Sequence, residues 1–431
     1  MTCDPPYPRL GEALRFLSGA LDTKRRNRDI DRLAREGDFD WELISGLIDE
    51  LIVEPLARQI DPPFANLVGQ WLAFVKDEYV RSLRTISLDA LSREEALPLL
   101  ERHLFSAWVA NLLVVTKDRF GGPDLRLLLA PNETHSPLFP EVNPIDAVFL
   151  WIEHTAGIRG GALTNLFYSI HDGDPGQRDQ VERWRKGKYL PDLGSVVIVL
   201  NSWERLRIRH PNMPSHVNCL RWLLVARAIC WAERRSSDLR RNITEHLDAL
   251  QTGPTDVGPY FDEAIASAAR PATEVIPIAL QAMHALSLHG TKEVGALASA
   301  DALLREMGQV FDRIEMRYAI DYWWHWCNAR QSALCGKLAE AMHHYEQAAD
   351  LALYRCGPEQ KTLLREAIYL AAHLKKASIY KQLMHRCLAL EMVPRPYSGL
   401  ETPSWIPMDY YSRFFECEFP ESGRFREGTD D

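Results

Sequence analysis

A run of hydrogen-bonding side chains between residues 177 and 188 is the part of the sequence best suited to bind a negatively charged ligand. Its members are two glutamines, three arginines and two lysines: Gln177, Arg178, Gln180, Arg183, Arg185, Lys186 and Lys188. Arg and Lys make charge-assisted hydrogen bonds to phosphate oxygens, and Arg and Gln also bond to base edges in the major groove of DNA. Between residues 178 and 209 the sequence holds eight Arg or Lys residues against four Asp or Glu residues. A chain with a formal net charge of −9 therefore carries a local positive patch.

A short predicted helix positions these side chains. Val181 and Trp184 are three residues apart and share one helical face, so the basic side chains, Arg185 among them, are expected to point outward. Gly187 ends this helix, and Pro191 suits the first turn of the next one. We expect a helix over residues 193–200, although the β-branched run at 196–200 by itself favours a strand.

The stretch from residue 180 to 196 resembles the second half of a Cro/repressor-type (XRE) helix-turn-helix. In that family the recognition helix ends in Trp, a basic residue and Gly, and Leu-Pro begins the next helix, as Trp184, Gly187 and Pro191 do here. The resemblance implies a first helix over 145–157, a second over 163–170 and a recognition helix over 177–186. It also implies that the seven side chains of the run contact double-stranded DNA, as in a bacterial transcription regulator.

Two other interpretations of this run stay open. A short basic helix can cover a helical core, with Trp184 buried and its charges in solvent, and the same fold can bind a protein instead of DNA. Sequence motifs for catalysis are absent, and we expect a protein that is not an enzyme and has no cofactor. His325, Cys327 and Cys335 lack the paired spacing of a zinc site, so no metal is expected either.

Helical periodicity continues in the C-terminal part as three predicted helix pairs. They cover 275–286 with 297–311, 318–334 with 339–353, and 361–374 with 377–390. The middle pair places small residues, a turn glycine and an aromatic residue at Ala329, Gly336, Ala341, Tyr345 and Ala348. This arrangement resembles the tetratricopeptide repeat, a helix pair of about 34 residues. The resemblance implies an α-solenoid whose concave surface binds a peptide or a protein.

Aromatic residues are concentrated at two places in this part of the chain. Tyr322, Trp323 and Trp326 either line the partner-binding surface or form core. Between residues 405 and 419 lie six further aromatic residues, too many for a free tail, so we expect the chain up to Pro420 to pack on the helices or on a second subunit. The last eleven residues are expected to stay disordered.

Length and composition fit an all-α protein with several parts. The chain has 431 residues, of which 46% are hydrophobic, and no apolar run long enough to cross a membrane. It has eight cysteines without a Cys-x-x-Cys pair, and no signal peptide is expected at its N-terminus, so we expect a reducing cytoplasm. The predicted parts are a helical domain (1–116), a Pro/Gly-rich loop or linker (117–143), the helix-turn-helix-like module with the following helix (144–250), the helical-repeat domain (260–393) and an aromatic, acidic tail (394–431).

These observations lead to one favoured function and one alternative. The favoured function is a sequence-specific DNA-binding regulator whose repeats sense a partner or hold a homodimer together. The alternative is an interaction scaffold in which the central module does not bind DNA.

Overall fold

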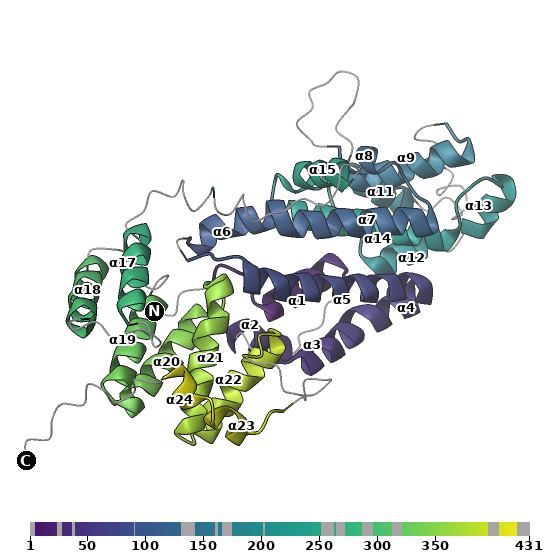
Figure 1. Cartoon of the computed structure of the whole chain (residues 1–431). Helices are drawn as coiled ribbons and strands as arrows, with labels where there is room; N and C mark the ends of the chain where they lie inside the picture. The colour runs from purple at the N-terminus through teal and green to yellow at the C-terminus, as the bar shows by residue number, and fades with distance from the viewer. Residues whose placement is uncertain are drawn as a thin grey trace, which may run out of the picture. The chain divides into compact units, whose positions relative to one another are not determined.

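The computed structural model consists of helices joined by loops (Figure 1). It describes residues 5–23, 28–36, 39–89, 91–130, 143–159, 163–165, 175–200, 203–250, 263, 272–286, 296–312, 321–394 and 405–419. Within these ranges every regular element is a helix and none is a strand, which confirms the predicted all-α class. None of the described helices has a stretch long and apolar enough to cross a lipid bilayer.

The chain forms two compact units, each assembled from segments that are distant in the sequence. Unit 1 comprises Met1–Pro8, Lys76–Pro98 and Asp256–Asp431, and unit 2 comprises Arg9–Val75 and Leu99–Thr255. The predicted helical domain over 1–116 therefore contributes residues to both units. The long helix α5 (Pro62–Thr85) passes from unit 2 into unit 1.

Unit 2 contains the predicted helix-turn-helix-like module and the helices around it. Its elements, besides the first part of α5, are α1 (Leu10–Ala20), α2 (Arg28–Glu36), α3 (Trp41–Ile48), η1 (Asp49–Val53), α4 (Glu54–Gln59), η2 (Glu101–Phe105), α7 (Ser106–Phe120), α8 (Leu125–Leu128), α9 (Pro144–Ala156), α11 (Pro175–Arg185), α12 (Leu193–Leu200), α13 (Trp203–Arg209), α14 (His216–Glu233) and α15 (Leu239–Leu250).

Helix boundaries in unit 2 follow from capping residues that the sequence supplies. At the start of α9, the Asn143 side chain accepts a hydrogen bond from the backbone of Ile145 (2.9 Å), and Pro144 occupies the first turn. The same helix ends at Gly157, which has a left-handed backbone (φ 65°), as the sequence predicts. The short helix α8 begins after Asp124, whose side chain accepts a hydrogen bond from the backbone of Arg126 and so caps its first turn.

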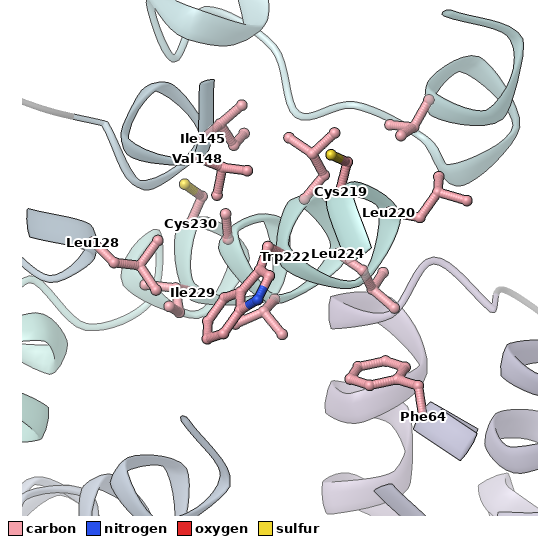
Figure 2. Close-up of a cluster of buried hydrophobic side chains, with 14 of the residues drawn as sticks. Phe64, Leu128, Ile145, Val148, Cys219, Leu220, Trp222, Leu224, Ile229 and Cys230 are labelled. Atoms are coloured by element: carbon pink, nitrogen blue, oxygen red, sulfur yellow. The ribbon is translucent and has the colours of Figure 1, made fainter. Parts of the chain in front are cut away.

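The core of unit 2 lies between α9, α14 and their neighbours. Figure 2 shows Ile145 and Val148 of α9 next to Cys230 of α14, and Trp222 lies in the same cluster. Ile145, Val148 and Trp222 are all 0% exposed. Trp222 also donates a hydrogen bond from its indole nitrogen to the backbone oxygen of Gly121 (2.7 Å), so this large side chain is buried without an unpaired polar group.

Unit 1 contains the predicted helix pairs and the C-terminal segment. Its elements, besides the last part of α5, are α6 (Arg93–Leu100, except its last two residues), α17 (Ala272–Ala285), α18 (Ala296–Phe311), α19 (Asp321–Leu334), α20 (Leu338–Ala352), η4 (Gly357–Glu359), α21 (Gln360–His373), α22 (Ala377–Ala389), α23 (Met408–Ser412) and α24 (Phe415–Glu418).

The helices of unit 1 pair as neighbours along the chain, with α17 against α18, α19 against α20, and α21 against α22 (Figure 1). Gly336 has a left-handed backbone (φ 74°) in the turn between α19 and α20, where a residue with Cβ would be strained. Ala329, Ala341 and Ala348 are all 0% exposed, so small residues line the contact between these two helices. Pairing of this kind is what the sequence predicts for this part of the chain.

The aromatic residues proposed for a partner surface lie in the core of unit 1. Tyr322 is 0%, Trp326 1% and Trp323 3% exposed, so the alternative interpretation, that of a core cluster, is the one that agrees with the structure. The reason is that buried acids accept hydrogen bonds from them: Asp89 accepts one from the Tyr322 hydroxyl (2.6 Å), and Glu366 accepts one from the Trp326 indole (2.8 Å). A polar atom on each ring is thereby satisfied inside the unit.

Asp89 makes the stability of unit 1 dependent on pH. Burial raises the pKa of Asp89 from 3.8 to about 6, although hydrogen bonds from Tyr322 and Trp323 act against this rise. The folded chain thus holds a proton on Asp89 at pH values where the unfolded chain has lost it, so stability falls as pH rises from about 4 through 6. Asparagine does not titrate, so we expect the free energy of unfolding of Asp89→Asn to decrease by about 2 to 3 kcal/mol less over this pH range than that of the parent. Urea unfolding of both proteins from pH 4 to 7 tests this, and parallel pH curves would contradict it.

Candidate nucleic-acid interface

Helix α11 is held to unit 2 by apolar contacts on one side. Val181 is 0% and Trp184 3% exposed, and α11 packs against α9. The helix ends in a Schellman motif: the backbone N–H of Lys188 donates to the carbonyl of Arg183, and that of Gly187 donates to the carbonyl of Trp184 (3.0 Å each). Gly187 takes the left-handed conformation that this motif requires (φ 67°). Helix, stop and buried face therefore agree with the sequence prediction.

Arg185 does not point outward, which corrects its predicted position. Its side chain is 12% exposed and donates from Nε to Asp146 Oδ1 (2.6 Å) and from Nη1 to Glu153 Oε1 (2.9 Å), both on α9. Burial opposes the charge of Arg185, but the hydrogen bonds and charges of Glu153 and Asp146 outweigh it, so the pKa of Arg185 is raised. An arginine neutralised by two carboxylates is not free to bind a phosphate. Arg185 therefore anchors the helix and is not available to DNA.

The same ion pair reaches a third segment of the module. Glu153, 1% exposed, also accepts a hydrogen bond from the backbone N–H of Leu163 (3.2 Å), and Arg185 donates to the hydroxyl of Thr164 (3.4 Å). Residues 163–165 are helical and begin the predicted second helix, whose remainder lies outside the described residues. The network thus joins α9, residues 163–165 and α11, which correspond to the three helices implied by the helix-turn-helix resemblance.

Three basic side chains at the end of α11 are exposed to solvent, and we call them the basic ridge: Arg183, Lys186 and Lys188. Lys186 is 58% exposed and pairs with Glu182 of the same helix (2.5 Å). Arg183 lies 6.0 Å from the centre of the Tyr189 ring, which is itself 60% exposed. Within the described part of the chain, neither Arg183 nor Lys188 has a carboxylate at ion-pair distance. Two of the three charges are therefore available to an anionic ligand.

The other three candidate residues are placed less fully. Gln177, Arg178 and Gln180 all belong to α11, and Gln180 is half-buried. The side chains of Gln177 and Arg178 lie outside the described part of the structure.

The arginine directly after α14 joins the ridge, and sequence spacing alone does not place it there. Arg234 is exposed and shares one concavity of about 330 Å³ with Lys188 and Tyr189 and a second of about 390 Å³ with Lys186 and Arg185. The only signal in the sequence is that Arg234 belongs to a basic pair that follows an apolar helix.

The loop that follows Lys188, the last residue of the basic ridge, is held in place by a buried arginine. Arg227 of α14 donates to the backbone oxygens of Pro191 (2.7 Å) and Gly19 (3.0 Å) and to the carboxylate of Asp22 (3.0 Å). These bonds tie the loop after Lys188 to the end of α1, so the loop has a defined position beside α14. In the described residues there is no cluster of His, Cys, Asp and Glu that could hold a metal ion.

Comparison with known proteins adds no family assignment: no family model, curated protein or solved structure matches this chain.

Proposed function

We propose that the protein is a sequence-specific DNA-binding regulator that contacts double-stranded DNA through α11 and the basic ridge. The observation that carries the proposal is the division of α11 into two sides. Val181, Trp184 and Arg185 hold it to the unit, while Arg183 and Lys186 remain exposed. A helix that reads a major groove needs both a fixed inner side and a cationic outer side.

The charges suit phosphate binding at this place and not over the whole surface. The chain carries a formal net charge of −9, so DNA is repelled by most of it and attracted only where cations are gathered. Lys188 and Arg234 line one concavity, which also contains the carboxylates of Asp22 and Asp192, and these two cations are the groups that would bind a phosphate there. Arg183 lies about one helical turn before Lys186. In this proposal it is the residue of the ridge that reaches base edges.

Unit 1 would act as the regulatory part in this proposal. Its paired helices either sense a peptide or protein partner or hold two copies of the chain together as a homodimer. A dimer would place two copies of α11 on two half-sites of the DNA, which is how helix-turn-helix regulators gain specificity.

Binding to random-sequence duplex DNA at several salt concentrations tests the proposal. We expect Lys188→Ala and Arg234→Ala each to lower the slope of log affinity against log salt by about 0.9, because each removes one phosphate contact. Arg183→Ala should cost about 1 to 3 kcal/mol on a preferred site once one is known. Lys361→Ala, an exposed lysine of unit 1, is the matched control and should change neither quantity. Folded Arg183→Ala and Lys188→Ala proteins that bind DNA like the parent at low salt would refute the proposal.

A scaffold that does not contact DNA is the second candidate. It is favoured by the fact that Arg185 and Lys186 already pair with carboxylates, which reduces the charge available to phosphates. This candidate predicts no DNA binding by the parent protein even at low salt, so the same measurement separates the two.

A further inference from the structure

The C-terminal segment Trp405–Phe419 lies on the helix pairs of unit 1 as a short peptide would. Its two helices, α23 and α24, have five and four residues and both contact α21. Isolated helices of this length are unstable in water, because nucleation costs more than a single turn returns. The segment is therefore ordered by the surface on which it lies, as Trp405 and the residues after it were predicted to be.

Three aromatic side chains anchor the segment, and they are spaced four residues apart. Tyr411 is 0%, Phe415 2% and Phe419 1% exposed. A spacing of four places successive side chains on one face of a helical segment. Between them, Arg413 and Glu416 are exposed to solvent, while Phe414 is half-buried and stacks on Tyr369 with ring centres 5.8 Å apart.

The receiving surface is a set of aromatic rings from three helices, which we call the aromatic groove: Tyr345 of α20, Tyr369 and His373 of α21, and Tyr380 of α22. Each of the first three meets one anchor of the segment. The ring centres of Tyr369 and Tyr411 are 5.5 Å apart, those of His373 and Phe415 are stacked at 3.8 Å, and those of Tyr345 and Phe419 meet edge to face at 6.3 Å. Ring pairs in these geometries contribute beyond the apolar area that they bury.

Tyr380 fixes the start of the segment. Its hydroxyl donates a hydrogen bond to the backbone oxygen of Ile406 (2.8 Å), and its ring meets that of Trp405 edge to face at 5.7 Å. A side chain that bonds to the peptide backbone sets register without requiring a particular residue there. The groove thus specifies a backbone contact followed by aromatic residues at three positions.

We propose that the aromatic groove is a peptide-binding site, and that the segment Trp405–Phe419 is its internal ligand. A partner protein that carries aromatic residues at positions i, i+4 and i+8 binds in its place. This proposal specifies the partner surface of unit 1 and rests on the role proposed for that unit, not on DNA binding by unit 2.

The segment and the aromatic groove belong to the same chain, so an external partner must compete with the segment. A ligand on the same chain has an effective concentration of about 1 mM, so the groove is filled unless the partner binds tightly or the segment is weakened. The apparent affinity for an external peptide equals the affinity of the open groove multiplied by the fraction of molecules in which the groove is open. Weakening the segment should therefore raise the affinity for the external peptide.

A fluorescein-labelled peptide of residues 405–419, titrated with the full-length chain, tests this. Phe415→Ala removes the anchor that stacks on His373, and we expect the variant to bind the peptide at least roughly tenfold more tightly than the parent. A peptide with alanine in place of Tyr411, Phe415 and Phe419 should not bind either protein. A folded Phe415→Ala protein that binds no better than the parent would overturn the proposal.

A second measurement covers the case in which Phe415→Ala fails to fold. A protease site placed between residues 394 and 405 lets the segment be cut from the otherwise intact protein. We expect the cut segment to stay bound and to exchange with an excess of the labelled peptide. Unfolding on cleavage, or no exchange, would show that the segment is permanent core and would overturn the proposal. Neither result would affect DNA binding by the parent, so the two proposals fail separately.

Discussion

Replacing Glu366 with alanine should lower the free energy of unfolding by about 3 to 5 kcal/mol, because it leaves a buried arginine without its partner. Glu366 is 0% exposed and accepts hydrogen bonds from the Arg330 guanidinium, including one from Nε at 3.0 Å. The Arg330 side chain is 12% exposed, so solvent cannot replace the lost carboxylate. Burial opposes the charge of Arg330, and the charge and hydrogen bonds of Glu366 outweigh it, which raises the pKa of Arg330.

Two further donors lose their acceptor in the same variant. The indole of Trp326 and the hydroxyl of Tyr345 each donate to Glu366 at 2.8 Å, and both rings are buried. An unsatisfied buried donor costs about 1 to 3 kcal/mol, so the total lies at the upper end of the range. Urea unfolding measures the change. Glu340→Ala, at an exposed position of α20, is the control and should change stability by less than about 0.5 kcal/mol. A loss below about 1 kcal/mol for Glu366→Ala would show that the network does not hold the helix pairs together.

Helices were predictable because the information for them is local. The periodicity of apolar residues, Asn143 and Gly157 at the ends of α9, and Gly336 between α19 and α20 all act within one or two turns of the chain. Tyr411, Phe415 and Phe419 were likewise predictable as packed residues, since aromatic side chains at this density are too apolar for a free tail.

What could not be predicted depends on residues far apart in the sequence. Glu366 lies in an amphipathic helix, where a glutamate is normally exposed, and its partner Arg330 is 36 residues earlier. For Tyr322 and Trp323 the sequence left a partner surface and a core position both open, and the residue that decides for the core, Asp89, lies more than 230 residues away and accepts from both. Spacing within a helix shows which residues share a face, but not which faces meet.

Arg185 illustrates the same limit in the candidate DNA-binding module. One position after the buried Trp184, it lies at the side of the buried face, where the choice between solvent and core depends on the neighbouring helix. That neighbour, α9, offers Asp146 and Glu153, 39 and 32 residues earlier. Two carboxylates at that position make an anchor of a residue that was predicted to contact DNA.

Arg185→Ala should therefore lower the free energy of unfolding by about 3 to 5 kcal/mol, because it leaves the buried Glu153 carboxylate without a cation. Arg183→Ala, two residues earlier and exposed, should leave stability within about 0.5 kcal/mol of the parent while weakening DNA binding. Replacing both buried partners, with Arg185→Met and Glu153→Leu, should recover much of the lost stability, since no uncompensated charge remains on Glu153. If that double variant folds, its DNA affinity should have the same salt dependence as the parent, because Arg185 neutralises no phosphate. If Arg185→Ala instead unfolds with the same free energy as the parent and its DNA affinity depends less on salt, then Arg185 contacts DNA and is not an anchor.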